Sequence, residues 1–215
     1  MTTTLTALCI GQPTPFRGEE RSAIDKHAVE GPVAIRRLGL EGDAVADPKH
    51  HGGPEMAVHH YPHDHYPMWR DFLGGHDLLE RGGAFGENIV AEGWPEETVH
   101  IGDRFRIGSA VLEVSSPRQP CWKIEHWFER KGMVKHILKT HACGWYYRVI
   151  EEGVAQAGEP IERVEAGHAD WSVARVFACL YDPDHRTLPA DLSEIAGLER
   201  LAPEWREKAE RHSSG

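Results

Sequence analysis

One cysteine in this sequence stands where its thiol could do chemistry. Cys121 lies between a proline and a tryptophan in SSPRQPCWKIEHW (115–127), and the apolar spacing that begins at Ile124 predicts a helix starting close to it. The dipole of such a helix and the guanidinium of Arg118 both favour the thiolate, which is the nucleophilic and metal-binding form of cysteine. These features are equally compatible with a small core side chain and with a functional thiol.

The other three cysteines lack this setting. Cys9 lies in the apolar run 5–11 and Cys179 lies among Val, Phe and Leu on a predicted helix, so both are interpreted as core residues. Cys143 follows a predicted helix, where the dipole disfavours a thiolate. No C-x-x-C pair occurs, and the wide spacing predicts a reduced, cytoplasmic protein and not a disulfide framework.

A cluster of histidines is the second candidate for chemistry. The segment HHGGPEMAVHHYPHDH (50–65) contains His50, His51, His59, His60, His63 and His65. Histidine is the commonest metal ligand, so a zinc or iron site is one hypothesis. The segment has no H-E-x-x-H motif, and adjacent histidines on a strand point to opposite faces. Surface or anion-binding histidines are the alternative.

Glycine-rich segments form the third candidate. GLEGDAVAD (39–47), HHGGPE (50–55) and GGAFGEN (82–88) can bring backbone N–H groups close to an anion, or can mark tight turns. Neither of the common nucleotide-binding glycine motifs occurs. A small-anion site is therefore compatible with the sequence, whereas a nucleotide-binding loop is not predicted.

The elements that must position these residues are mainly strands. Apolar or alternating runs predict strands at 5–11, 31–40, 56–61 and 87–93, and a hairpin at 103–116. Short helices are predicted at 63–75, after Cys121 and after Gly132. Near residue 167 the pattern changes, and 170–182, 188–198 and 201–212 each predict a helix. We therefore expect a mainly β domain over residues 1–167 and a three-helix domain over residues 168–215.

Composition limits the classes of partner. The chain has 215 residues, 40% apolar and 27% charged, with a net charge of −10. A chain this acidic is not expected to bind a nucleic acid polymer, which requires a basic face. No apolar run approaches the ~18 residues of a membrane-spanning helix, so no membrane association is expected.

Seven short segments, in this order, resemble the MOSC family, and most closely its YiiM-like branch. They are SAIDK (22–26), GLEGD (39–43), DPKHHGGPEMAVHHY (47–61), FGENI (85–89), IGD (101–103), PRQPC (117–121) and GWYYRV (144–149). Each segment alone is a weak signal, but seven in the family's order are a strong one, and the likeness extends over essentially the whole chain, including the three-helix tail typical of that branch. The resemblance implies a MOSC-type β-barrel with packed helices, followed by a small three-helix module.

The resemblance also implies a pyranopterin molybdenum cofactor in a surface groove, with Cys121 as the metal ligand and a catalytic residue. Implied cofactor contacts are Lys26, His50, Gly52, Gly53, Gly86, Glu87, Asn88 and Arg118, and His51 is the implied second catalytic residue. The alternative for Lys26 is a solvated surface lysine, and for Asn88 a hydrogen bond within its own loop. Met56 departs from the family pattern, in which a basic residue is usual.

The activity that the resemblance implies is reduction of N-hydroxylated compounds of the hydroxylamino-purine type. Because the sequence shows no flavin or iron–sulfur motif, the electrons are expected from a separate flavoprotein-type reductase. Two rival hypotheses are a non-enzymatic carrier of the cofactor or of sulfur, and a hydrolase with a histidine-bound metal. The helical tail is compatible with a homodimer, with a cover over the groove, or with docking of the reductase.

Overall fold

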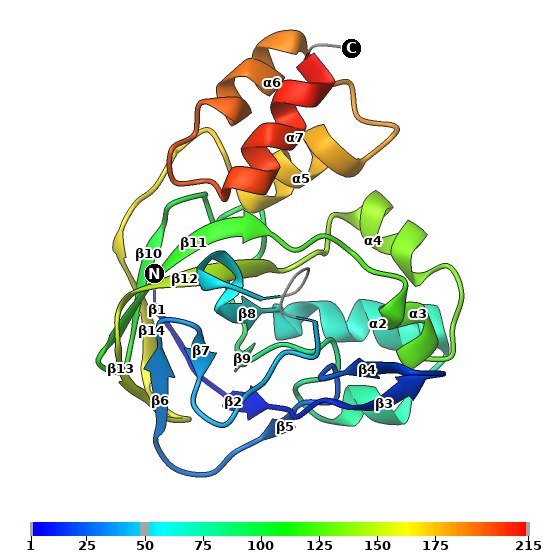
Figure 1. Ribbon diagram of the computed structural model, residues 1–215, viewed down its shortest axis with the longest axis vertical. Helices are drawn as coiled ribbons and strands as arrows, with labels where there is room; N and C mark the ends of the chain where they lie inside the picture. Colours follow the sequence, from blue (N-terminus) through cyan, green and yellow to red (C-terminus); the bar gives the residue numbers. More distant parts are fainter. Residues whose placement is uncertain (1, 48–51, 214–215) are drawn as a thin grey trace.

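The computed structural model describes residues 2–47 and 52–213, and Figure 1 shows their arrangement. Nine strands of this part form one curled sheet, a half-barrel, in the order β1-β14-β10-β11-β12-β8-β9-β2-β5. They are β1 (Thr2–Thr4), β2 (Ala7–Ile10), β5 (His27–Ala28), β8 (Val58–His60), β9 (Ile89–Val90), β10 (Arg104–Ile107), β11 (Ala110–Pro117), β12 (Trp145–Glu151) and β14 (Pro160–Glu165). The fold is therefore mainly β, as predicted.

Two smaller sheets complete the β structure of the described residues. One joins β13 (Gly153–Ala155), β6 (Val33–Arg36) and β7 (Gly39–Leu40), and the other is the hairpin of β3 (Thr14–Arg17) and β4 (Glu20–Ser22). Most strand pairs are antiparallel, whereas β8 and β9 pair in parallel. This parallel contact brings the end of the predicted strand 56–61 beside the predicted strand 87–93.

Short helices cover the half-barrel, and a helical module follows it. The helices are η1 (Pro54–Met56), η2 (His63–His65), α2 (Tyr66–Leu73), η3 (Asp77–Glu80), α3 (Lys123–Trp127), α4 (Met133–Thr140), α5 (Val173–Tyr181), α6 (Pro189–Ala196) and α7 (Pro203–Ser213). The last three form the module drawn from yellow to red at the top of Figure 1. Within residues 2–47 and 52–213, no helix is both long and apolar enough to cross a bilayer.

Strand β11 is the element that leads to the cysteine segment. It pairs with β10 across the predicted turn at Gly108 and Ser109, where Ile107 lies opposite Ala110, and it pairs with β12 on its other side. All eight of its residues are buried. A strand buried and paired on both edges is rigid, so the chain enters the segment 118–121 from a fixed point.

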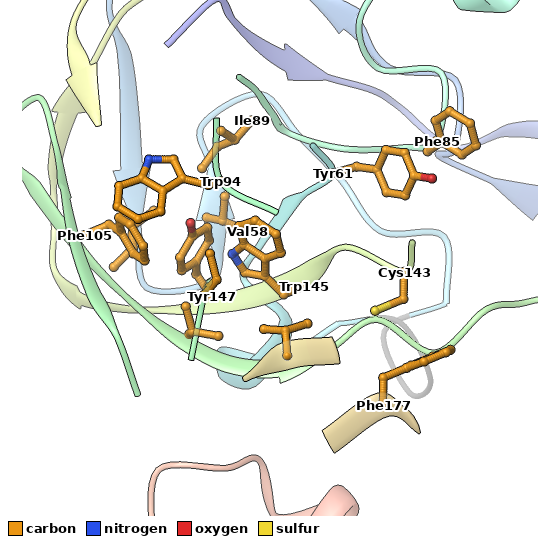
Figure 2. Packing of buried hydrophobic residues seen from close by; sticks show 14 of the residues in the cluster. Val58, Tyr61, Phe85, Ile89, Trp94, Phe105, Cys143, Trp145, Tyr147 and Phe177 are labelled. Carbon is orange, nitrogen blue, oxygen red and sulfur yellow. The ribbon is translucent and has the colours of Figure 1, made fainter. Parts of the chain in front are cut away.

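The core is aromatic and crosses from the half-barrel into the helical module. Figure 2 shows Trp94, Phe105, Trp145 and Tyr147 packed together, and Phe177 of α5 on the side of Cys143. All these side chains belong to one cluster of buried residues. The half-barrel and the module therefore share a continuous hydrophobic core.

The core assignment of Cys9 and Cys179 is confirmed, since both are buried. Burial raises the pKa of Cys9 to about 12 and raises the pKa of Cys179. Cys143, which the sequence left open, is also buried, and burial raises the pKa of its thiol as well. These three cysteines therefore carry neutral thiols at neutral pH.

A buried glutamate on β11 interacts with three arginines. Glu113 is 3% exposed, and its two carboxylate oxygens accept from Arg104 and Arg148, each at 2.7 Å. Arg200, which precedes α7, lies 3.7 Å from the same carboxylate. Arg148 in turn pairs with Glu55 of η1, so the cluster links the helical module to the segment that follows Gly53.

We predict that Glu113→Ala lowers the free energy of unfolding by about 2–4 kcal/mol, because it leaves neighbouring guanidiniums without their buried acceptor. Urea denaturation of the full chain measures this change. The control is Glu207→Ala, which removes an exposed ion pair with Arg211 of 3.8 Å and costs less than about 1 kcal/mol. Equal losses in the two variants would contradict the prediction.

Candidate functional site

A cavity of about 240 Å³ lies where the segments 22–26, 38–47, 85–88 and 118–123 meet. Five of the residues predicted from the sequence line it: Lys26, Gly86, Asn88, Arg118 and Cys121. The structure thus brings together residues that are up to 95 positions apart in the chain (121 − 26). His50 and His51 lie outside the described residues.

Cys121 follows directly from the end of β11. The backbone N–H of Arg118 donates to the Gly144 carbonyl at 3.0 Å, and the Cys121 carbonyl accepts from Ile124 N–H at 3.1 Å. The helix expected at Cys121 begins two residues later, at Lys123, and spans only five residues. Of the four cysteines, Cys121 alone is only partly buried, so its thiol is the accessible one.

Gly144 fixes the backbone behind this loop. Its φ of +67° is in the left-handed region, and a Cβ there would lie 2.6 Å from the carbonyl oxygen of His60. Its N–H donates to the buried carboxylate of Glu96 at 2.7 Å. Only glycine satisfies both constraints, and its carbonyl is thereby aimed at Arg118.

Two cations flank Cys121 in the cavity wall. Arg118 and Lys123 both line the cavity, and neither has a carboxylate partner within ion-pair distance among the described residues. Cations without counter-ions in a concave site favour an anionic ligand. Arg118 and Lys123 are therefore the candidate contacts for the anionic part of a ligand in this cavity.

Lys26 is in a different electrostatic situation. It is 7% exposed, and its ammonium group hydrogen-bonds both carboxylate oxygens of Asp43. The Asp43 carboxylate also accepts from the Gly11 N–H and from the Asn88 amide, each at 2.8 Å. Lys26 is thus not a solvated surface lysine, but its charge is balanced by a residue that sequence reasoning missed.

Asn88 connects three segments beneath the cavity. Besides Asp43, its amide nitrogen donates to the Cys9 carbonyl at 3.0 Å, and its amide oxygen accepts from the His59 N–H at 3.0 Å. The alternative of a bond within its own loop is therefore wrong. Asn88 ties β2, β8 and the segment 85–88 together while its side chain remains in the cavity wall.

Glu87 has a supporting position. It is fully buried and does not line the cavity. Its carboxylate accepts from the Tyr66 hydroxyl at 2.5 Å, from Gly83 N–H at 2.8 Å and from Phe85 N–H at 2.9 Å, and burial raises its pKa. These bonds fix the turn that places Gly86 at the cavity. Glu87 therefore supports the cavity wall but does not line the cavity.

Gly52 and Gly53 also stay outside the cavity wall. Gly53, with a φ of +100°, immediately precedes η1, whose last residue, Met56, does line the cavity. In this structure the two glycines set the direction in which the chain enters η1.

The adjacent histidines of β8 point to opposite faces, as predicted. His59 lines the cavity, where burial and the nearby Arg118 lower its pKa. His60 faces the core, where its Nδ1 lies 3.1 Å from the Tyr147 hydroxyl and burial lowers its pKa to about 3. Sequence reasoning did not single out His59 as a site residue, although the alternation along β8 was the available signal.

The remaining described histidines of the cluster pair with carboxylates. His63 lies 3.3 Å from Glu92, and His65 lies 2.7 Å from Glu96. Residues 2–47 and 52–213 contain no group of three or more His, Cys, Asp or Glu that could hold a metal ion. The hypothesis of a histidine-bound metal thus finds no ligand set in the part of the chain that is described.

We predict that stability falls in acid because His59 and His60 are buried in the neutral state. Their folded pKa values lie below 6.5, so below pH 6.5 the unfolded chain binds protons that the folded chain does not. Their stabilising effect is therefore present above pH 6.5 and is lost as the pH falls towards the folded pKa values. Each contributes up to about 1.4 kcal/mol per pH unit.

Urea denaturation between pH 6 and pH 5 measures this slope. His60→Gln is expected to reduce it by about 1 kcal/mol per pH unit, whereas His212→Gln, at an exposed position of α7, leaves it unchanged. An unchanged slope in His60→Gln would show that His60 is not the group responsible.

Comparison with known proteins agrees with this arrangement. Residues 47–162 match the family model described as the MOSC domain, and residues 171–211 match the model described as the YiiM-like, 3-alpha helix domain. The chain belongs to the MOSC family. MOSC domains are generally associated with binding of the molybdenum cofactor.

Several relatives are similar over most of the chain. The uncharacterized protein YflK of Bacillus subtilis is 37% identical over 93% of this chain and 90% of its own length. The protein YiiM of Escherichia coli is 39% identical over 79% of this chain and 78% of its own. The crystal structure of YiiM from Geobacillus stearothermophilus has a TM-score of 0.82 at 30% identity, and the match covers 98% of this chain and 99% of that one.

A longer relative carries a functional name. A protein of Gibberella moniliformis named "Reductase" is 41% identical over 74% of this chain, but the match spans only 28% of that protein. The named activity belongs to the whole fungal protein, and this chain corresponds to about a quarter of it.

The residues of the cavity fit a molybdenum cofactor. An accessible thiol is a soft ligand that suits a transition metal, and Arg118 and Lys123, which have no carboxylate partner among residues 2–47 and 52–213, suit a phosphate. The chain therefore provides both donor types that such a cofactor requires, within one cavity.

Proposed function

We propose that the protein is a molybdenum-cofactor-dependent oxidoreductase that reduces N-hydroxylated compounds of the hydroxylamino-purine type. The observation that carries the proposal is the accessible thiol of Cys121 in a cavity with two cations that lack carboxylate partners among the described residues. Membership of the MOSC family and the fungal relative named "Reductase" support an enzymatic role. When bound, the cofactor supplies a two-electron redox metal that can accept an oxygen atom.

The chain's own residues hold and orient the ligands. Cys121, as the thiolate, is the metal ligand, and Arg118 and Lys123 bind the anionic part of the cofactor. The Lys26–Asp43 pair adds no net charge, so the proposed anion contacts are Arg118 and Lys123, which form no ion pair with another described residue. Asn88 keeps the floor of the cavity in place through its bonds to β2 and β8.

The substrate is expected to contact the apolar part of the wall. Leu38, Leu40, Val45 and Met56 line the cavity, and Leu38 is 67% exposed. Apolar side chains at the edge of a polar site favour a planar, partly apolar ring. A purine-type ring matches this surface, whereas a small hydrophilic substrate leaves it uncovered.

The electrons are proposed to come from a separate flavoprotein-type reductase. The net charge of −10 favours a donor with a basic docking face, and such association is faster at low ionic strength. A rate of reduction that does not depend on salt would count against electrostatic docking.

We predict that Cys121→Ala abolishes molybdenum binding. In protein from a host that makes the cofactor, mass spectrometry is expected to find molybdenum in the unmodified chain and at least about tenfold less in Cys121→Ala, because a lost ligand costs more than a lost supporting contact. The control is Cys179→Ala, since Cys179 is buried in the helical module. Zinc or iron that survives Cys121→Ala would contradict the proposal.

Turnover separates an enzyme from a carrier. With a chemical reductant and an N-hydroxylated purine, the loaded enzyme is expected to release the amine repeatedly, and Cys121→Ala is expected to be inactive. Molybdenum binding without turnover, together with transfer of the cofactor to an acceptor protein, would favour the carrier hypothesis.

A further inference from the structure

The three-helix module contacts the half-barrel at the segment that carries Cys121. The Tyr181 hydroxyl, at the end of α5, donates to the side-chain oxygen of Gln119 at 2.8 Å. The Ala202 N–H, just before α7, donates to the Ser115 carbonyl on β11 at 2.8 Å. The module therefore holds the chain two residues and six residues before the cysteine.

The residue after Tyr181 holds the opposite side of the loop. The Asp182 carboxylate lies 2.9 Å from Nε2 of His141, the residue that ends α4. Three residues further on, Gly144 accepts the Arg118 N–H. The end of α5 thus anchors the cysteine segment 118–121. It also anchors the segment 141–144, which is hydrogen-bonded to that cysteine segment.

Tyr181 is itself held in one orientation. Its ring stacks on Phe177, with centroids 5.5 Å apart, and packs against Trp205 at 5.1 Å. The ammonium group of Lys208, which belongs to α7, lies 3.3 Å from the centroid of the Tyr181 ring. Burial and the nearby Glu204 raise its pKa to about 12, so the hydroxyl keeps its proton and donates to Gln119.

The hydrophobic core also fixes the orientation of the Tyr181 ring, through Phe177. Phe177, one helical turn before Tyr181, lies in the shared hydrophobic cluster on the side of Cys143, as Figure 2 shows. The Phe177–Tyr181 pair is fixed by the core. The Tyr181 hydroxyl is therefore held in one place as the hydrogen-bond donor to Gln119, whose side chain is otherwise exposed to solvent.

We propose that Tyr181 is a positioning residue for Cys121, and that the three-helix module acts as a clamp on the loop 118–121. That a fixed Cys121 thiol helps metal binding rests on the proposed function. The clamp itself exists in the protein without cofactor. With the loop fixed, Cys121 stays in the wall of the cavity that Arg118 and Lys123 also line. With the loop released, the thiol is more accessible to solvent and less defined as a ligand.

The clamp has a modest strength. The hydrogen bond between Tyr181 and Gln119 is exposed, so water competes for it. The net effect of a bond of this kind corresponds to roughly a two- to tenfold change in the equilibrium between held and released loop. Such a change is measurable as thiol reactivity without unfolding the chain.

The experiment uses the full chain without cofactor and a bulky maleimide. Because the other three cysteines are buried, the initial rate of labelling reports on Cys121, and Cys121→Ala gives the background. Tyr181→Phe, which keeps the ring and removes the hydroxyl, is expected to label roughly two- to tenfold faster. Gln119→Leu is expected to show the same increase.

Coupling between the two positions distinguishes the hydrogen bond from a general loosening. The double variant Tyr181→Phe with Gln119→Leu is expected to label no faster than either single variant, since both remove the same bond. Gln119→Glu keeps an oxygen acceptor for the Tyr181 hydroxyl, and its negative charge disfavours the reactive thiolate, so it is expected to label no faster than the original chain. Ser193→Ala, which removes one exposed hydrogen bond of α6, serves as the matched control and leaves the rate unchanged.

Labelling of Tyr181→Phe at the original rate would overturn the proposal. So would fully additive increases in the double variant, or an equal increase in Ser193→Ala. Because molybdenum does not enter this measurement, failure of the clamp and failure of the proposed function are separately visible. A chain that binds no molybdenum can still show the clamp.

Discussion

The complete burial of β11 is the constraint on which the site depends. The strand is paired on both edges, and three features of the molecule are attached to it. The Glu113 carboxylate binds the arginine side chains, and the Ser115 carbonyl accepts a hydrogen bond from the helical module. The strand ends at Pro117, where the cysteine segment begins. A strand with one free edge could shift with its loop, whereas this one cannot move without breaking two ladders.

Charge balance then decides what the cavity can bind. Lys26 and Asp43 form a buried pair whose carboxylate also receives the Gly11 N–H and the Asn88 amide. Such a pair costs desolvation energy and is held by its additional hydrogen bonds. Through these bonds the Asp43 carboxylate links Gly11, which follows β2, to Asn88, while Arg118 and Lys123 line the same cavity as Cys121.

Much of the fold followed from local patterns in the sequence. The hairpin of β10 and β11 was predicted because Phe105 and Ile107 alternate with arginines before a glycine turn. The three terminal helices were predicted from their spacing and from Pro189 and Pro203 at their starts. In these elements the local preference and the tertiary environment agree, which is why a single sequence suffices.

The missed features all depend on contacts between distant residues. Asp43 meets Lys26 across 17 positions, and Gln119 meets Tyr181 across 62, and no periodicity encodes either distance. Glu87 lies one residue from Gly86 and Asn88, but only the depth of its burial separates it from the cavity wall. Motif segments from distant parts of the chain meet at the cavity, whereas the direction of each side chain required the three-dimensional structure.

The continuous core has a consequence for how the molecule folds. Phe177 and Trp205 of the helical module belong to the same cluster as Val114 and Trp145 of the half-barrel. Two family models divide the chain, yet the buried apolar residues of both parts belong to one cluster. The protein is therefore expected to unfold in one cooperative transition, in which the two sequence modules form a single thermodynamic unit.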